Sequence, residues 1–246
     1  MDLVWLALGG FILVAYTLEA ITGFGSIVIA LSLGMLVLPL DVVLPILVAL
    51  NIPMSGTIAF KNRHSIEFNL LLKIILPGML LGTLTGYFIK PYINEDMLKQ
   101  AFGLLVVWFA ARELWRMYNS HEDQPRPVWI TRIITFFAGI THGLFASGGP
   151  LLVYAVAGTK IDKAAFRATM IVVWFSMNIV LATAFLLDGR LQPLLGNIAM
   201  YLPLLLVAIK LGNYLHEKIN EKHFRLGIYC LLLVTGLILI VGRYIR

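Results

Sequence analysis

Two glycine-rich segments hold the residues of this chain that are best suited to binding chemistry. They read EAITGFGS at 19–26 and THGLFASGGP at 141–150, and each interrupts a long apolar stretch. Glycine allows backbone conformations that end one helix and start another, and a newly started helix presents unpaired N–H groups and about half a positive charge. Each segment therefore predicts a place where a small anion can bind without a fixed Lys or Arg.

Hydroxyl groups beside the glycines, and two asparagines in later apolar stretches, would add hydrogen-bond donors. Asn51 and Asn178 occupy equivalent positions in two halves of the chain, where an amide can contact substrate or form a structural hydrogen bond. The glycines could instead serve only to let helices pack closely. We predict an anion site made by Thr22, Gly23, Gly25, Ser26, Asn51, Ser147, Gly148, Gly149 and Asn178.

Two ionisable residues lie next to these breaks. Glu19 precedes the first break, and His142 lies at the equivalent position in the second. Ionisable groups inside apolar segments are rare and costly, so they are candidates for function. Glu19 could carry a coupling proton, and His142 could relay protons or pair with the anion. Alternatively, each satisfies backbone groups that the helix break leaves free.

The remaining residues of chemical interest argue against an enzyme or a metal site. The chain has one cysteine, Cys230, and its five histidines show no metal-ligand spacing with acids or cysteine. No nucleophile–base pair and no ATP-binding motif can be assembled, so we expect no metal and no cofactor. The tryptophans fall mostly near the ends of apolar segments, which is typical of membrane-interface belts: Trp5, Trp108, Trp115, Trp129 and Trp174.

The composition indicates that these breaks lie inside a membrane. Of the 246 residues, 60% are hydrophobic and only 13% are charged, which excludes an ordinary water-soluble domain. Several apolar stretches approach the roughly 20 residues that a helix needs to cross a bilayer, and those directly after the breaks are shorter. We predict an all-α polytopic membrane protein with about eight spans and with broken or re-entrant helices at the two breaks. The net charge of +6 is assigned to topology and not to nucleic acid.

The chain also repeats itself. Five matches share one offset of 126 residues, with Pro77, Gly86 and the INE tripeptide at 93–95 recurring as Pro203, Gly212 and INE at 219–221. Arg63 recurs as Arg190, and we expect these two arginines at opposite membrane faces, as anchors or gates. Duplicated bundles that hold substrate between their halves are common among transporters. We predict a first repeat at 1–118, a cytoplasmic linker at 119–127 and a second repeat at 128–246.

The distribution of basic residues predicts how the repeats are oriented. If each half crosses the membrane an odd number of times, 14 of the 19 Lys and Arg residues fall on one side. The others are Lys90, Lys99, Arg190, Arg243 and Arg246. The positive-inside rule therefore favours two inverted halves with both termini in the periplasm.

The motifs of the two breaks also resemble a known family. TGFGS at 22–26, followed by an apolar run that ends in Leu38-Pro39, and GLFASGGP at 143–150 are similar to the TauE/SafE family of sulfite exporters, which includes 4-toluene sulfonate uptake permease-like proteins. The resemblance covers essentially the whole chain. It implies an anion transporter of bacterial inner membranes, with the lipid bilayer and a small anion of the sulfite, sulfonate or thiosulfate class as its partners.

These observations favour a secondary transporter of small anions that works by alternating access. An anion channel and, less favoured, a membrane-embedded enzyme are the alternatives.

Overall fold

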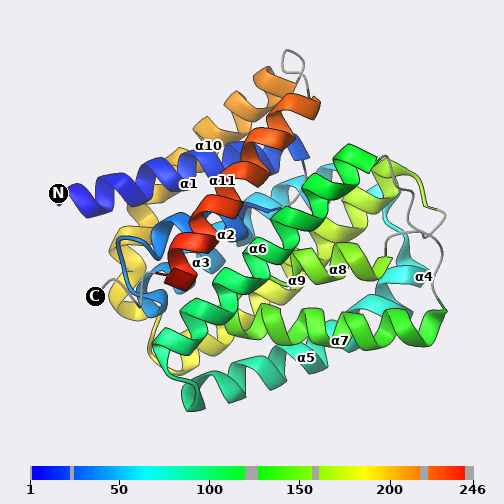
Figure 1. Ribbon diagram of the computed structural model, residues 1–246, viewed down its shortest axis with the longest axis horizontal. Coiled ribbons are helices and arrows are strands. Elements are labelled where there is room, and N and C mark those ends of the chain that lie inside the picture. The colour runs from blue at the N-terminus through cyan, green and yellow to red at the C-terminus, as the bar shows by residue number, and fades with distance from the viewer. Residues whose placement is uncertain (1, 23–24, 120–126, 157–160, 217–220, 242–246) are drawn as a thin grey trace.

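The computed structural model describes residues 2–22, 25–119, 127–156, 161–216 and 221–241, and in these ranges the chain is helical with no strand (Figure 1). Helices are expected for so apolar a chain, because a helix satisfies its own backbone groups where lipid offers no partners. Six apolar helical segments in the described part are long enough to cross a membrane: Leu3–Ile21, Leu40–Lys61, Phe68–Tyr92, Val128–Phe145, Ala164–Leu187 and Gln192–Gly212. The predicted all-α polytopic membrane protein is confirmed.

Equivalent helices follow in the same order in the two halves. The first half contains α1 (Leu3–Thr22), α2 (Ser26–Gly34), α3 (Leu40–Lys61), α4 (Phe68–Leu70), α5 (Leu76–Ile89) and α6 (Glu95–Asn119). A π-helical turn, Leu71–Ile75, joins α4 to α5, and 3-10 turns lie at Arg63–Ser65 and Lys90–Tyr92. The second half contains α7 (Val128–Phe145), α8 (Gly149–Val156), α9 (Lys163–Leu187), a 3-10 turn (Gln192–Leu194), α10 (Leu195–His216) and α11 (Glu221–Val241).

The helices that follow the two breaks are short. α2 has nine residues and α8 has eight, so each is about 12–14 Å long and cannot cross a bilayer alone. The prediction of short helices after the glycine-rich segments is confirmed. The first turns of these helices therefore lie inside the bundle. Lipid offers no hydrogen-bond acceptor to the free N–H groups of a helix start there.

Helices of one half pack against exchanged partners of the other. α1 packs along α10, and its counterpart α7 packs along α5, which is the counterpart of α10. The repeated glycines allow both contacts. A Cβ atom on Gly86 would come within 2.3 Å of the Ile140 carbonyl oxygen on α7, and one on Gly212 would come within 2.4 Å of the Ala20 Cβ atom on α1. In each contact, one half supplies the glycine and the other half supplies the helix that packs against it.

The central pair of the bundle is α3 with α9, which occupy the same place in the two halves. The start of α3 lies beside the end of α9, because Arg190 approaches Asp41. Just beyond the end of α3, the Glu67 N–H group donates to the Thr169 hydroxyl, near the start of α9, at 3.0 Å. The two helices are therefore antiparallel, as inverted halves would require. In Figure 1, α1 begins and α11 ends on the left, whereas α6 ends and α7 begins on the right.

Candidate functional site

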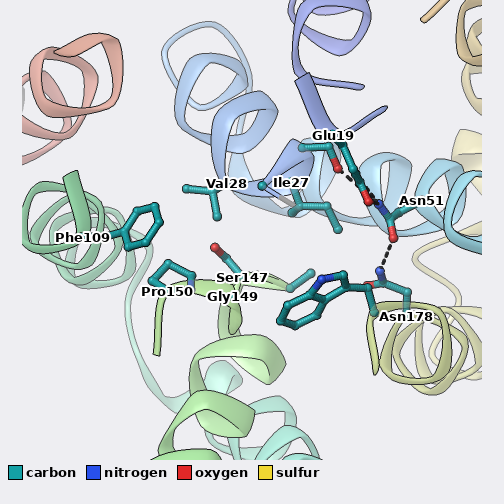
Figure 2. A pocket seen from close by; sticks show the side chains of 13 residues that line it. Glu19, Ile27, Val28, Asn51, Phe109, Ser147, Gly149, Pro150 and Asn178 are labelled. Carbon is teal, nitrogen blue, oxygen red and sulfur yellow. Dashed lines mark hydrogen bonds between the residues drawn. The ribbon is translucent and has the colours of Figure 1, made fainter. Parts of the chain in front are cut away.

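The two short helices meet at one cavity in the middle of the bundle (Figure 2). The cavity has a volume of about 30 Å³, which is room for about two water molecules. A larger anion would need the surrounding helices to move apart. Seven of the residues predicted from sequence line the cavity: Glu19, Gly25, Ser26, Asn51, Ser147, Gly149 and Asn178. Apolar side chains and Trp174 form the rest of its wall.

The first break starts α2 from a left-handed residue. Gly25 has φ of 98° and caps the helix, a conformation that suits glycine and few other residues. Its carbonyl accepts the first helical hydrogen bond from the Ile29 N–H group at 3.1 Å. Ser26, Ile27 and Val28 in the first turn of α2 line the cavity, and the N–H groups of a first turn have no partner within their own helix. Thr22 ends α1, but its side chain and Gly23 lie outside the described residues.

The second break turns at an alanine. Ala146 has φ of 50°, and its N–H group donates to the His142 carbonyl at 2.6 Å, which closes the end of α7. A left-handed conformation costs a residue with a Cβ atom free energy, and such positions cluster at functional sites. Ser147 follows at the cavity wall, and α8 begins at Gly149. Both N-terminal helix ends therefore direct partial positive charge at the same small space.

A chain of buried polar groups lies on one side of the cavity. The Asn51 amide donates to both carboxylate oxygens of Glu19, at 3.0 and 3.3 Å, and to the Ser26 hydroxyl at 3.2 Å. Asn178 donates to the Asn51 amide oxygen at 2.7 Å. All four side chains are buried. Figure 2 shows this chain running from Glu19 through Asn51 to Asn178.

Polar groups that lack hydrogen-bond partners among the described residues also line the cavity. Among the described residues, the Ser147 hydroxyl, the Trp174 indole N–H group and the Asn178 amide oxygen are buried without a hydrogen bond. All three residues line the cavity. Leaving such a group unpaired costs about 1–3 kcal/mol, so a bound partner is the ordinary explanation. Two orphan donors beside two helix N-termini are suited to an oxyanion.

Two of the predicted residues lie away from the cavity. Gly148 packs against α7, where a Cβ atom would come within 2.4 Å of the Ala138 carbonyl oxygen. The His142 ring stacks on Trp174, with centroids 6.2 Å apart. Both of its nitrogens are buried and make no hydrogen bond of normal geometry to any described residue, although the Met177 backbone lies close enough to interact. His142 therefore lies behind the cavity wall and not in it.

The sequence reasoning missed two residues of this region. Trp174 was expected in an interface belt, which is wrong: it lies in the middle of α9, is 7% exposed and forms part of the cavity wall. Arg167 is absent from the predicted site, but it lies in α9, and its guanidinium donates to the Ala20 carbonyl at 3.0 Å. Its charge acts on Glu19. The signal that was available was the arginine's place one turn inside an apolar helix.

Comparison with known proteins agrees with this architecture. The family model described as Sulfite exporter TauE/SafE matches residues 7–239. The chain belongs to the TauE/SafE family. It is therefore a multi-pass membrane transporter, and the resemblance seen in the break motifs is confirmed.

Two relatives have names that agree with membership of the TauE/SafE family. The probable inner membrane transporter protein TsaS of Comamonas testosteroni is 24% identical over 197 residues, which cover 78% of this chain and 80% of that protein. A probable membrane transporter protein of Methanocaldococcus jannaschii is 24% identical over 179 residues, covering 64% of this chain and 62% of that protein. No solved structure has a significant match to the chain.

Proposed function

We propose that this TauE/SafE protein carries a small sulfur-containing or organic anion, of the sulfite, sulfonate or thiosulfate class, across the bacterial inner membrane. The observation that carries the proposal is the cavity where α2 and α8 begin. Two helix N-termini and the unpartnered donors of Ser147 and Trp174 face it. An oxyanion would satisfy these donors and would be stabilised by both helix dipoles, with no lysine or arginine among the described residues of the cavity wall.

Transport would proceed by alternating access between inverted halves, with both termini in the periplasm. The antiparallel packing of α3 on α9 supports this proposal, because the halves can then rock about a central contact. The small size of the cavity also supports it, since a carrier passes through a state that is closed to both sides. The energy would come from the proton gradient or from the gradient of the anion.

Glu19 is the proposed proton carrier. It is 1% exposed and accepts hydrogen bonds from Asn51 at the cavity edge. A proton on this carboxyl group would remove a negative charge beside the anion, so proton and anion would favour each other's binding. Arg167 would offset the charge of Glu19 in the state without a proton.

The principal alternative is an anion channel that uses the same cavity. A carrier saturates as anion concentration rises and is slow, whereas a channel gives flux nearly proportional to concentration over the same range. A membrane-embedded enzyme has less support, because no group of three or more His, Cys, Asp or Glu residues suitable for a metal occurs among the described residues.

The test is ligand stabilisation of the purified protein. A ligand that binds only the folded state raises the melting temperature with its concentration. We expect sulfite, thiosulfate or sulfoacetate to raise it, with sulfate, taurine and lactate as the comparison set. If none of the six anions changes the melting temperature, and vesicles containing the protein show no saturable flux of any of them, the proposed function is wrong.

A further inference from the structure

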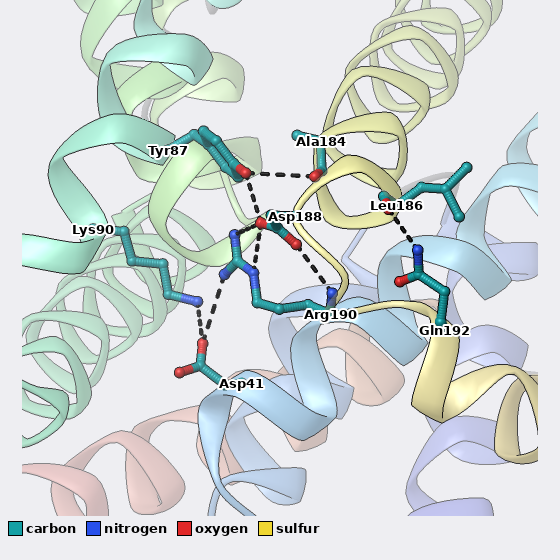
Figure 3. A network of polar contacts seen from close by, with 8 residues as sticks. All are labelled: Asp41, Tyr87, Lys90, Ala184, Leu186, Asp188, Arg190 and Gln192. Atoms are coloured by element: carbon teal, nitrogen blue, oxygen red, sulfur yellow. Dashed lines mark hydrogen bonds and ion pairs between the residues drawn. The ribbon is translucent and has the colours of Figure 1, made fainter.

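A second group of charged residues lies at the end of the bundle where α3 begins and α9 ends (Figure 3). The Lys90 ammonium group contacts the Asp41 carboxylate at 2.6 Å, and the Arg190 guanidinium lies 3.9 Å from the same carboxylate oxygen. The Tyr87 hydroxyl donates to Asp188 at 2.6 Å. Asp41, Tyr87 and Lys90 come from the first half, and Asp188 and Arg190 come from the second.

These residues mark one boundary of the membrane-spanning region. One apolar span begins at Leu40, one ends at Tyr92, and another ends at Leu187. Asp41, Lys90 and Arg190 thus lie where three spans meet the interface. In the proposed topology, this boundary faces the periplasm.

The two partners of the Lys90–Asp41 pair differ in exposure. The Lys90 side chain is 6% exposed, whereas that of Asp41 is 64% exposed. A buried ammonium group without a partner would be costly, so Lys90 needs an anion beside it. The exposed Asp41 carboxylate can turn into solvent when another anion takes its place beside Lys90. The cation is therefore fixed, and the anion that neutralises it is exchangeable.

Arg190 is held in place without the help of Asp41. Its Nε atom donates to Asp188 at 2.7 Å. Its guanidinium plane lies over the Phe185 ring at 4.6 Å and near the Tyr87 ring at 5.4 Å. These contacts orient the guanidinium in advance, which favours binding of a planar or pyramidal oxyanion. The long 3.9 Å contact to Asp41 leaves it loosely paired on that side.

We propose that Lys90 and Arg190 form a second anion-binding site at the outer mouth, which the protein's own Asp41 carboxylate occupies in this structure. The site would take a small oxyanion such as a carboxylate, sulfonate or sulfite, since each offers oxygens like those of Asp41. Asp188 stays bound to Arg190 and Tyr87. When Asp41 turns away, one positive charge is left uncompensated at the mouth and attracts the anion.

The outer site and the central cavity share their supporting helices. Asp41 precedes Asn51 by ten residues on α3, and Asp188 follows Asn178 by ten residues at the end of α9. At 1.5 Å per residue, each helix carries the two sites about 15 Å apart. An anion captured at the mouth is therefore about 15 Å from the central cavity along these helices. This inference rests on the proposed function, since it concerns the capture of the same anion.

The test measures sulfite flux in membrane vesicles of each orientation, so that sulfite reaches the Lys90 side or the opposite side alone. Lys90→Gln should raise KM from the Lys90 side about tenfold, because a charged hydrogen-bond partner is lost, and should leave the maximal rate unchanged. Asp41→Asn should lower KM from that side, because it removes the competing carboxylate. Lys99→Gln is the matched control: Lys99 pairs with Glu95 at 2.9 Å outside this group. It should behave as the wild type.

Melting temperatures identify variants that fail to fold. A misfolded variant can only lose transport, so the lower KM expected for Asp41→Asn could not result from misfolding. Unchanged KM in both variants would overturn the proposal. So would a changed maximal rate with unchanged KM, which would make the group a structural contact or gate. A wild type that shows no saturable sulfite flux would instead contradict the proposed function.

Discussion

Asn51 and Asn178 lie 127 residues apart at equivalent positions of the two repeats, and they hydrogen-bond each other directly at 2.7 Å. A contact between equivalent residues lies on the axis that would relate the two halves. The two sides of that axis differ, because Asn51 also binds Glu19 and Ser26, whereas the Asn178 amide oxygen has no partner among the described residues. The pair therefore joins Asn51, whose amide nitrogen and oxygen are both hydrogen-bonded, to Asn178, whose amide oxygen has no partner among the described residues.

This asymmetry predicts unequal effects of removing the two amides. Asn51→Ala removes the donor to the buried Glu19 carboxylate and should lower stability by about 1–3 kcal/mol. Asn178→Ala leaves only the Asn51 oxygen unpaired and should cost less. Thermal unfolding of the purified variants measures both. Equal losses would mean that the polar chain is not centred on Asn51.

Much of the fold could be predicted from sequence because its causes are local. The apolar stretches indicate helices, and glycines in matching places mark breaks. The repeated pair Gly86 and Gly212 was visible as a pattern, and the structure gives its physical reason, which is close packing of α5 on α7 and of α10 on α1. The inverted orientation of the whole halves stays a prediction.

The site was only partly predictable because its composition depends on how helices rotate about their axes. Ser147 and Gly149 were found from their motif, but the same motif gave no reason to separate Gly149, at the cavity wall, from Gly148, packed on α7. Trp174 could not be distinguished from an interface residue without knowing which face of α9 is buried. The long side chain of Arg167 lets its guanidinium reach the Ala20 carbonyl, and the spacing of residues in the sequence does not show which partner it reaches.

The Ser147 hydroxyl at the cavity wall predicts a variant that affects binding without affecting stability. Ser147→Ala removes a buried hydroxyl with no partner among the described residues, so the melting temperature should not fall. Sulfite binding should weaken by about 1–3 kcal/mol if the hydroxyl donates to the anion. Ser32→Ala is the control, because that buried hydroxyl donates to the Val28 carbonyl at 2.6 Å and does not line the cavity. Equal affinity of both variants and the wild type would place the anion elsewhere.

The topology predicts opposite labelling of two introduced cysteines. Asp2 is exposed just before α1, and Ser120 lies at the junction of the two repeats. In a Cys230→Ala background, which removes an exposed thiol, Asp2→Cys should react with an impermeant reagent in intact cells. Ser120→Cys should react only after the membrane is opened. Labelling of both from the same side would leave only a parallel arrangement of the halves.

Asp188 predicts a dependence of stability on acidity. Partial burial acts to raise the pKa of this carboxyl, but hydrogen bonds from Arg190 and Tyr87 outweigh it and hold the pKa below 3.8. A lowered pKa means that the group stabilises the folded state above pH 3.8 and loses this effect as pH falls through its folded-state pKa. The melting-temperature difference between wild type and Asp188→Asn should therefore be positive at neutral pH and shrink below pH 3.8.

A second variant separates this charge effect from a change in packing. Tyr87→Phe keeps the ring beneath Arg190 and removes the hydroxyl that donates to Asp188. It should give a smaller loss with the same direction of pH dependence. A difference between wild type and Asp188→Asn that grows on acidification would contradict the assignment.

The last prediction concerns coupling to protons. Glu19→Gln mimics the protonated carboxyl and keeps an oxygen that can accept from the Asn51 amide, which now donates at 3.0 Å. The variant should bind sulfite at least as tightly as the wild type, because the charge of Arg167 is no longer offset by Glu19 and the anion meets less repulsion. Its binding should lose the pH dependence of the wild type, and its flux should no longer respond to a proton gradient. His142→Gln is the comparison, because His142 lies behind the cavity wall and its replacement should leave the pH profile intact. If the pH profile of Glu19→Gln matches that of the wild type while that of His142→Gln is flattened, the proton is carried by the histidine.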